Sequence, residues 1–180
     1  MMKRLLLVCA VGLALAPVSP GGVLAGSAAK VDVPKGENPM YHYWAPFKTG
    51  PWVKKRTAAV GNVTEIKHEL TKVSADAVEV TMVMKAGPQE IRTPTTHKKK
   101  LDTSGSDSSK DKFDVKESEE NLSVGGKSVK SYKVERKAKD GSMQSTSWFS
   151  KEVPGYTVKS MSKVGGTESK MEVVEYEAKK

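Results

Sequence analysis

The chain of 180 residues contains a single cysteine, Cys9. Cys9 lies inside an apolar run over residues 5–16, which follows Lys3 and Arg4 and precedes the small-residue stretch "GGVLAGSAA". This order of charged, apolar and small residues is typical of a secretory signal peptide, and we expect cleavage after Ala25. The mature chain then contains no cysteine, which excludes disulfides, cysteine nucleophiles and thiolate metal sites.

The sequence also lacks an apolar run long enough to cross a bilayer as a helix. A spanning helix needs about 20 apolar residues, and the run over residues 5–16 is shorter. We therefore expect an exported protein without a transmembrane segment in its mature chain. An exported domain without disulfides fits a bacterial envelope, so the expected location is periplasmic or extracellular.

Residues that carry chemistry are scarce. The three histidines, His42, His68 and His97, have no histidine partner at a metal-binding spacing. No Gly-x-Ser-x-Gly elbow and no glycine-rich phosphate loop is present. We therefore expect no metal, no cofactor and no enzymatic activity. The remaining enzymatic hypothesis is a hydrolase that uses His68 or His97, assembled in space rather than by a motif.

Positive charge is in excess. The formal net charge is +9, and removal of Lys3 and Arg4 with the signal peptide lowers it to +7. Two basic clusters stand out, Lys54, Lys55 and Arg56 in one and Lys98, Lys99 and Lys100 in the other. They are interpreted either as a solvated surface that protects sheet edges or as a contact with anionic envelope polymers or lipid headgroups. An exported protein is not expected to bind nucleic acid.

Short turn signals and alternating side chains dominate the mature sequence. Pairs such as Gly61-Asn62, Asp140-Gly141 and Gly165-Gly166 are typical of tight hairpins, and the segments between them alternate between apolar and polar residues. The sequence predicts an all-β fold with at most one short helix. It is an antiparallel up-and-down meander of about eight or nine long strands, curled into a half-barrel or open barrel. The predicted strands are 52–60, 63–73, 77–85, 89–97, 119–124, 127–138, 142–152, 156–163 and 167–178.

The domain organisation follows from composition. Residues 1–25 are the signal peptide, residues 26–37 a flexible arm, and residues 38–180 a single β-sheet domain. Within that domain, the serine-rich and charged residues at about 98–118 predict a mobile loop. Asn38 and Pro39 favour the start of a short helix, which should end before Pro46.

Aromatic residues are few, eleven in all, and five of them lie between Tyr41 and Trp52. The spacing of Tyr41, Trp44 and Phe47 places their rings on one face of a helical turn. Two interpretations remain open: the rings fill the concave side of the curled sheet, or they rim a pocket for an apolar or amphiphilic ligand. The candidate ligand-binding residues are Tyr41, Trp44, Phe47, Trp52, Ile66, Leu70, Val78, Val80, Met82 and Met84.

Several segments resemble a group of uncharacterised bacterial secreted proteins. The likeness rests on "YHYWAPFKTGPWVKKRT" and on "GGKSVKSYKVE" followed by "STSWFSKEVPGYTVKS". The strand, "Val-Pro-Gly" and strand unit at Val153, Pro154 and Gly155 is also similar, more distantly, to the outer-membrane lipoprotein-carrier (LolA/LolB-like) half-barrels. That resemblance implies a curled sheet whose concave face binds acyl chains. The first resemblance implies no known activity.

Overall fold

The computed structural model describes residues 31–101 and 112–179. The predicted signal peptide, the start of the predicted arm and residues 102–111 of the predicted mobile loop lie outside the described residues. Within the described residues, no helix is long and apolar enough to span a membrane.

One helix and nine strands make up the described fold. The helix α1 (Pro39–Trp44) begins at Asn38, whose side chain accepts a hydrogen bond from the backbone N–H of Met40 at 3.0 Å. The strands are β1 (Trp52–Ala59), β2 (Asn62–Val73), β3 (Ala77–Ala86), β4 (Gln89–Lys98), β5 (Phe113–Val124), β6 (Lys127–Ala138), β7 (Met143–Phe149), β8 (Thr157–Val164) and β9 (Thr167–Glu177).

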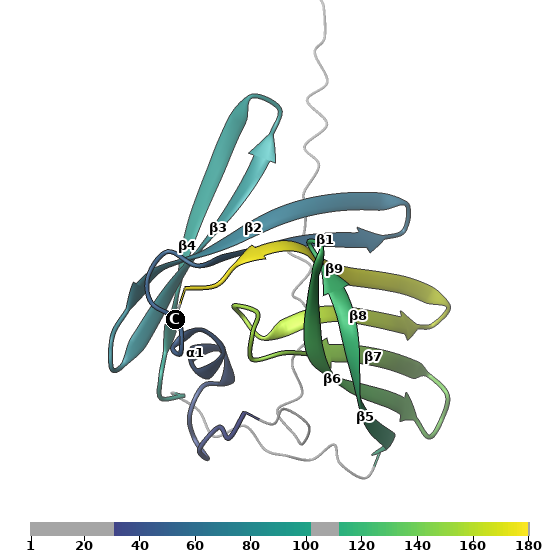
Figure 1. The fold of residues 1–180 in the computed structure, drawn as a ribbon. Coiled ribbons are helices and arrows are strands. Elements are labelled where there is room, and N and C mark those ends of the chain that lie inside the picture. Colours follow the sequence, from purple (N-terminus) through teal and green to yellow (C-terminus); the bar gives the residue numbers. More distant parts are fainter. Residues whose placement is uncertain (1–30, 102–111, 180) are drawn as a thin grey trace, which may run out of the picture.

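The nine strands form one open antiparallel sheet in the order β4-β3-β2-β1-β9-β8-β7-β6-β5. The predicted fold class is therefore confirmed: the fold is all-β with one short helix and an open, curved sheet. Neighbours in sequence pair everywhere except between β4 and β5, which occupy opposite edges, while β1 pairs with β9. Figure 1 shows the sheet curving over α1, which lies on its concave side.

Tight turns join most of the strands at or next to the predicted positions. The first turn forms at Val60 and Gly61, one residue earlier than predicted, and both residues have positive φ angles of 47° and 78°. Two positive φ angles are needed for a two-residue turn whose twist matches the strands. The alternating segments between the turns thus become long paired strands.

The main departure from the predicted strand bounds is at β5. The sequence predicts a loop at about 98–118 and a strand only from residue 119, whereas β5 begins at Phe113. β5 pairs with β6 along its whole length, from Phe113 opposite Ala138 to Val124 opposite Lys127. This pairing supplies the backbone hydrogen bonds that the polar composition does not predict, because strand propensity depends strongly on context.

The described part of the predicted flexible arm is attached to the chain that follows β4. The backbone N–H of Asn38 donates to the carbonyl of Lys99 at 2.7 Å, and that of Leu101 donates to the carbonyl of Gly36 at 3.0 Å. Val31 also packs against the core. These contacts place α1 under the sheet edge formed by β3 and β4.

Candidate functional site

Three of the predicted aromatic residues lie in the hydrophobic core. Tyr41, Trp44 and Phe47 are 8%, 2% and 3% exposed and belong to one buried cluster with side chains from the sheet. The hydroxyl of Tyr41 donates to the carbonyls of Ser74 and Ala75 in the β2–β3 turn, at 3.2 and 3.0 Å. Helix α1 therefore fills the concave side of the sheet with its rings.

The Val-Pro-Gly turn meets the helix directly. Gly155 has a φ of +75°, and a Cβ at this position would stand 2.8 Å from Cζ2 of Trp44. The backbone N–H of Gly155 donates to the carbonyl of Tyr43 at 3.2 Å, and the Tyr43 ring stacks on Tyr156 with centroids 4.8 Å apart. Only glycine combines this backbone conformation with so close an approach of the indole.

Trp52 is separate from the other three aromatic candidates. It is partly exposed, its indole N–H donates to a carboxylate oxygen of Glu177 at 3.0 Å, and the Lys67 ammonium lies 4.7 Å from its ring centroid. It pairs with Glu69 of β2, while the next residue, Val53, is fully buried. Because neighbouring strand residues face opposite sides, Trp52 lies on the outer surface of the sheet.

The face of the sheet that packs against α1 is called the inner face here, and it carries all six predicted aliphatic candidates. The registers place Leu70 opposite Val80 in adjacent strands. Burial divides the six into two groups, since Leu70, Val78 and Val80 are buried whereas Ile66, Met82 and Met84 keep partial exposure. The rings of α1 thus cover one end of this face and leave the other end partly open.

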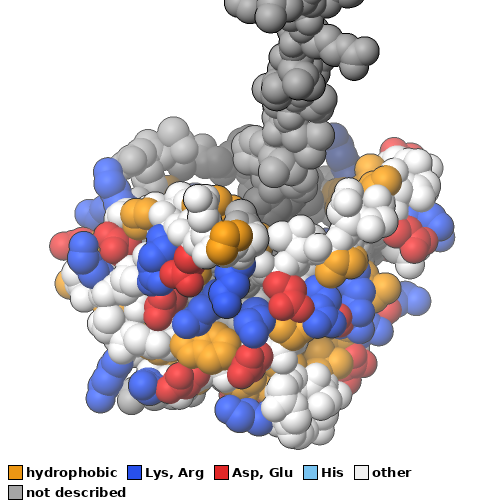
Figure 2. All heavy atoms as spheres, turned by 90° about the horizontal axis from the view of Figure 1, so that it is seen from above, with side chains coloured by type: hydrophobic (Ala, Val, Ile, Leu, Met, Phe, Trp, Pro, Cys, Tyr) orange, Lys and Arg blue, Asp and Glu red, His pale blue; other side chains and the backbone are white. Residues whose placement is uncertain are grey.

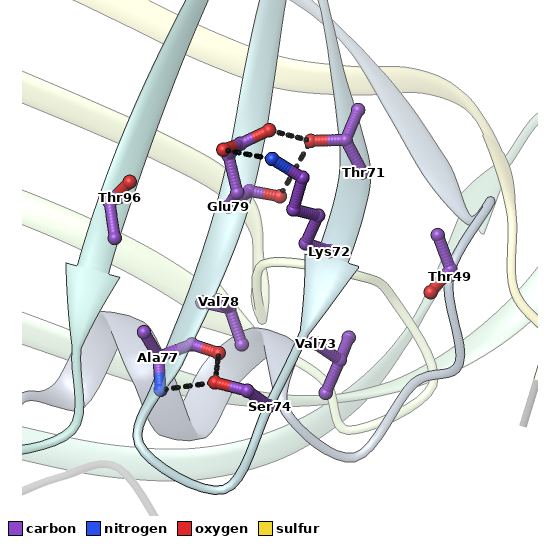
Figure 3. Close-up of a pocket in the computed structure, with 9 residues that line it drawn as sticks. All are labelled: Thr49, Thr71, Lys72, Val73, Ser74, Ala77, Val78, Glu79 and Thr96. Carbon is purple, nitrogen blue, oxygen red and sulfur yellow. Dashed lines mark hydrogen bonds and ion pairs between the residues drawn. The ribbon is translucent and has the colours of Figure 1, made fainter.

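An open cavity of about 390 Å³ lies beside the β2–β3 turn (Figure 3). Six of the nine residues that line it have polar side chains. The Thr71 hydroxyl donates to a carboxylate oxygen of Glu79 at 2.9 Å, and the Lys72 ammonium lies 3.2 Å from the same carboxylate. Ligand pockets of this size are usually lined mostly by apolar groups. The residues around it are Thr49, Thr71, Lys72, Val73, Ser74, Ala77, Val78, Glu79 and Thr96.

Of the predicted ligand-binding residues, only Val78 lines this cavity. Tyr41, Trp44, Phe47 and Trp52 do not. The threonines and the Lys72–Glu79 pair were not among the predicted residues, because a cavity between a turn and a neighbouring strand depends on strand pairing that period-two patterns do not specify. The turn signal at residues 75–76 marks the location but not its lining.

Three residues of the predicted basic surface, Lys54, Arg56 and Lys99, lie within 4.0 Å of a carboxylate. Lys54 lies 3.3 Å from Glu175, and Arg56 lies 2.8 Å from Glu65. On the face shown in Figure 2, Lys and Arg side chains alternate with Asp and Glu side chains rather than forming one basic patch. In the second cluster, the Lys99 ammonium lies 4.0 Å from a carboxylate oxygen of Glu37 and 6.0 Å from the centroid of the Tyr41 ring. Lys98 is the last residue of β4, and Lys100 forms an isolated backbone β-bridge with Glu37.

Lys55 differs from both of its neighbours because its side chain lies on the inner face. It stands opposite Ile66 of β2 and Val173 of β9. Lys55 is partly exposed by surface area, yet enough protein surrounds its ammonium for burial to lower its pKa to about 8.

Two histidines share this face with Lys55. Burial, followed by the charges of Lys55 and His97, lowers the pKa of His68 to about 4. Burial also lowers the pKa of His97. The Nδ1 atom of His68 is buried and has no hydrogen-bond partner among the described residues. Within residues 31–101 and 112–179 no group of three or more His, Cys, Asp or Glu side chains is placed to hold a metal ion.

Comparison with known proteins identifies a likeness in fold. No protein-family model matches the sequence, and no curated protein matches it significantly. Among solved structures, the crystal structure of MucB in complex with MucA(peri) is similar, with a TM-score of 0.56 and 11% sequence identity. The match covers 76% of this chain and 52% of that chain, so this chain spans about half the length of the MucB structure. The comparison supports a relation in fold to MucB and does not single out the lipoprotein carriers.

Proposed function

We propose that this chain is an exported, non-enzymatic protein of the bacterial envelope that binds another polypeptide by adding it as a strand to the outer edge of β5, which pairs with no further described strand. The observation that carries this proposal is the contrast between the two edges of the sheet. β4 contains Pro94 at its middle, opposite Thr81, whereas β5 is a twelve-residue strand without proline. Proline removes a backbone donor and protects an edge, so β5 is the edge suited to strand addition.

The usable part of this edge is Phe113–Glu120. Nearer the hairpin tip, β5 approaches β9. A Cβ added to Gly125 would stand 3.4 Å from the carbonyl oxygen of Val174, so little space is left there. Residues 114–120 are all exposed. A strand of about eight residues provides several backbone hydrogen bonds, which give affinity in strand addition, while side-chain contacts give specificity.

The charge of this segment indicates the chemistry of the partner. Asp114, Glu117, Glu119 and Glu120 outnumber the single cation Lys116. Glu119 is already bound by Lys130 at 2.8 Å, and Glu120 accepts a hydrogen bond from the indole N–H of Trp148. The partner segment is therefore extended and carries Lys or Arg, in line with electrostatic complementarity at interfaces.

The interior of the sheet gives less support to acyl-chain carriage at the aromatic cluster. The rings of Tyr41, Trp44 and Phe47 occupy the concave side themselves, and six of the nine residues that line the open cavity have polar side chains. Attachment to anionic polymers through the two lysine clusters also has less support, because Lys54 and Arg56 are paired with carboxylates. MucB was solved bound to a partner, MucA(peri), and this is a precedent for a protein of similar fold engaging a partner.

Site-specific photo-crosslinking in the native cell tests the proposal. A photoreactive residue replaces Ser118 on β5, and the matched control carries it at Thr93 on β4, since both positions are exposed edge-strand residues. We expect one discrete polypeptide crosslinked through position 118, identified by mass spectrometry, and none through position 93. Absence of a crosslinked polypeptide at position 118, or equal crosslinking at both positions, contradicts the proposal.

A further inference from the structure

The inner face of the sheet carries basic side chains from three strands. His68 of β2 stands opposite Val53 of β1, two residues from Lys55 on the same face. His97 of β4 stands opposite Val78, which belongs to the same face. Lys55 is therefore the near neighbour of His68, whereas His97 lies on a strand separated from β2 by β3, and the charges of both lower the pKa of His68.

On β1, β2, β3, β4 and β9, this basic group has no acidic counterpart on its own face. In the registers that join β1 to β2 and β9, Glu65, Glu69, Glu172, Glu175 and Glu177 stand opposite Arg56, Trp52 or Lys54, all on the outer face. The same alternation puts Glu79 and Glu90 on the outer face, opposite Lys72 and Lys85. Glu168 also lies on the outer face, because the next residue, Ser169, lies on the inner face. Besides Lys55, His68 and His97, the titratable group on this face of the same strands is Tyr176.

The polar atoms of this group are not satisfied within the described chain. Lys54 and Arg56 each have a carboxylate partner, whereas no ion pair of Lys55 exists among the described residues. The buried Nδ1 of His68 has no hydrogen-bond partner there either. Buried polar groups are normally satisfied, and an unpaired cation in apolar surroundings is unfavourable unless something binds it.

We propose that Lys55 and His68 bind the carboxylate of an amphiphilic molecule, whose apolar part lies along Ile66, Met82 and Met84. The Lys55 ammonium donates a charge-assisted hydrogen bond to the carboxylate, and the N–H of the His68 imidazole donates a second hydrogen bond. The three aliphatic side chains keep partial exposure at this end of the inner face, next to Ile91, which is 45% exposed. This inference does not depend on strand addition at β5, because none of these residues belongs to that edge.

Calorimetric titration of the full exported chain tests the site with three probes. Sodium decanoate has the carboxylate and the tail, decanol has the tail alone, and sodium acetate has the carboxylate alone. We expect decanoate to bind at least tenfold more tightly than either of the others. Equal affinity for decanol and decanoate would overturn the assignment, and so would the absence of decanoate binding.

Paired lysine variants locate the binding. Lys55→Met should weaken decanoate binding at least tenfold, because it removes the only ammonium on this face of β1. Lys54→Met, one residue away on the outer face, should change it less than twofold. If Lys55→Met does not fold, the imidazole resonances of His68 in the unmodified chain must shift on addition of decanoate. Unchanged resonances, or unchanged affinity in Lys55→Met, would contradict the proposal.

Discussion

The indole of Trp44 lies against Gly155, so that a Cβ added to the glycine would stand 2.8 Å from Cζ2 of the ring. This contact joins the aromatic segment near the N-terminus of the domain to the Val-Pro-Gly turn between β7 and β8. Real Cβ atoms do not approach other atoms so closely, and the 2% exposure of Trp44 leaves the ring little room to move. The glycine and the tryptophan thus form a single packing unit.

Gly155→Ala should lower the free energy of unfolding by about 2 to 4 kcal/mol, through overpacking and left-handed backbone strain together. Urea denaturation followed by tryptophan fluorescence measures the change. Gly141→Ala is the matched control, because Gly141 has a φ of +74° and nothing within 4 Å of an added Cβ. The Gly141→Ala variant therefore has only the backbone strain, and its free energy of unfolding should fall by about 1 kcal/mol. Equal losses in the two variants would show that the Trp44 contact is unimportant.

The two tryptophans of the aromatic segment should differ in their effect on stability. Trp44→Ala leaves a large internal cavity and should lower the free energy of unfolding by about 3 to 5 kcal/mol. Trp52→Ala removes a partly exposed ring and its hydrogen bond to Glu177, so the loss should be only about 1 to 2 kcal/mol. Thermal and urea unfolding of both variants check the order, and a larger loss for Trp52→Ala would contradict the assignment of Trp44 to the core.

Much of the fold could be predicted from alternation and turns. The period of two correctly places Leu70 and Val80 on one face, because a buried face demands apolar residues at every second position. The same period does not identify partners, so the β1–β9 pairing and the separation of β4 from β5 could not be predicted. The start of β5 at Phe113 was missed since its charged residues lack an alternating pattern.

The candidate site was less predictable than the fold, because residues that are adjacent in the sequence of a strand lie on opposite faces of the sheet. "KKR" at residues 54–56 looks like one basic cluster, but strand geometry sends Lys55 inward and its neighbours outward. The opposite orientation of Lys55 and its two neighbours can be predicted once residues 52–60 are assigned to a strand. The effect of His97 on the pKa of His68 could not be predicted, because the two residues lie on strands that are separated by β3. The spacing that groups Tyr41, Trp44 and Phe47 does not extend to the strand residue Trp52.

Stability should fall as pH decreases from about 6.5 towards 4. His68 has a pKa of about 4 in the folded protein against 6.5 ordinarily, so the unfolded chain binds more protons in this interval. The free energy of unfolding should drop by about 2 kcal/mol between pH 7 and pH 5, at about 1.4 kcal/mol per unit below 6.5. Urea denaturation at the two pH values measures it. His68→Met should show a smaller drop, and an identical drop would contradict the role of His68.

Removing the charge of Lys55 should stabilise the protein. Lys55→Met replaces an unpaired ammonium among apolar side chains, and we expect a gain of about 1 to 2 kcal/mol in the free energy of unfolding at pH 7. The gain should shrink above pH 8, where the unmodified Lys55 loses its proton, since its pKa is about 8. Lys54→Met serves as the control and should give no gain, because it breaks an exposed ion pair with Glu175. A destabilised Lys55→Met variant would contradict this account.

The most direct test of strand addition is hydrogen exchange in the complex captured through position 118, compared with the free chain. Strand addition should slow exchange at alternate backbone amides of Phe113–Glu120, because only every second N–H of an edge strand faces outward. It should cause no change along β4, Gln89–Lys98. Unchanged exchange along β5 in the captured complex would contradict strand addition at this edge.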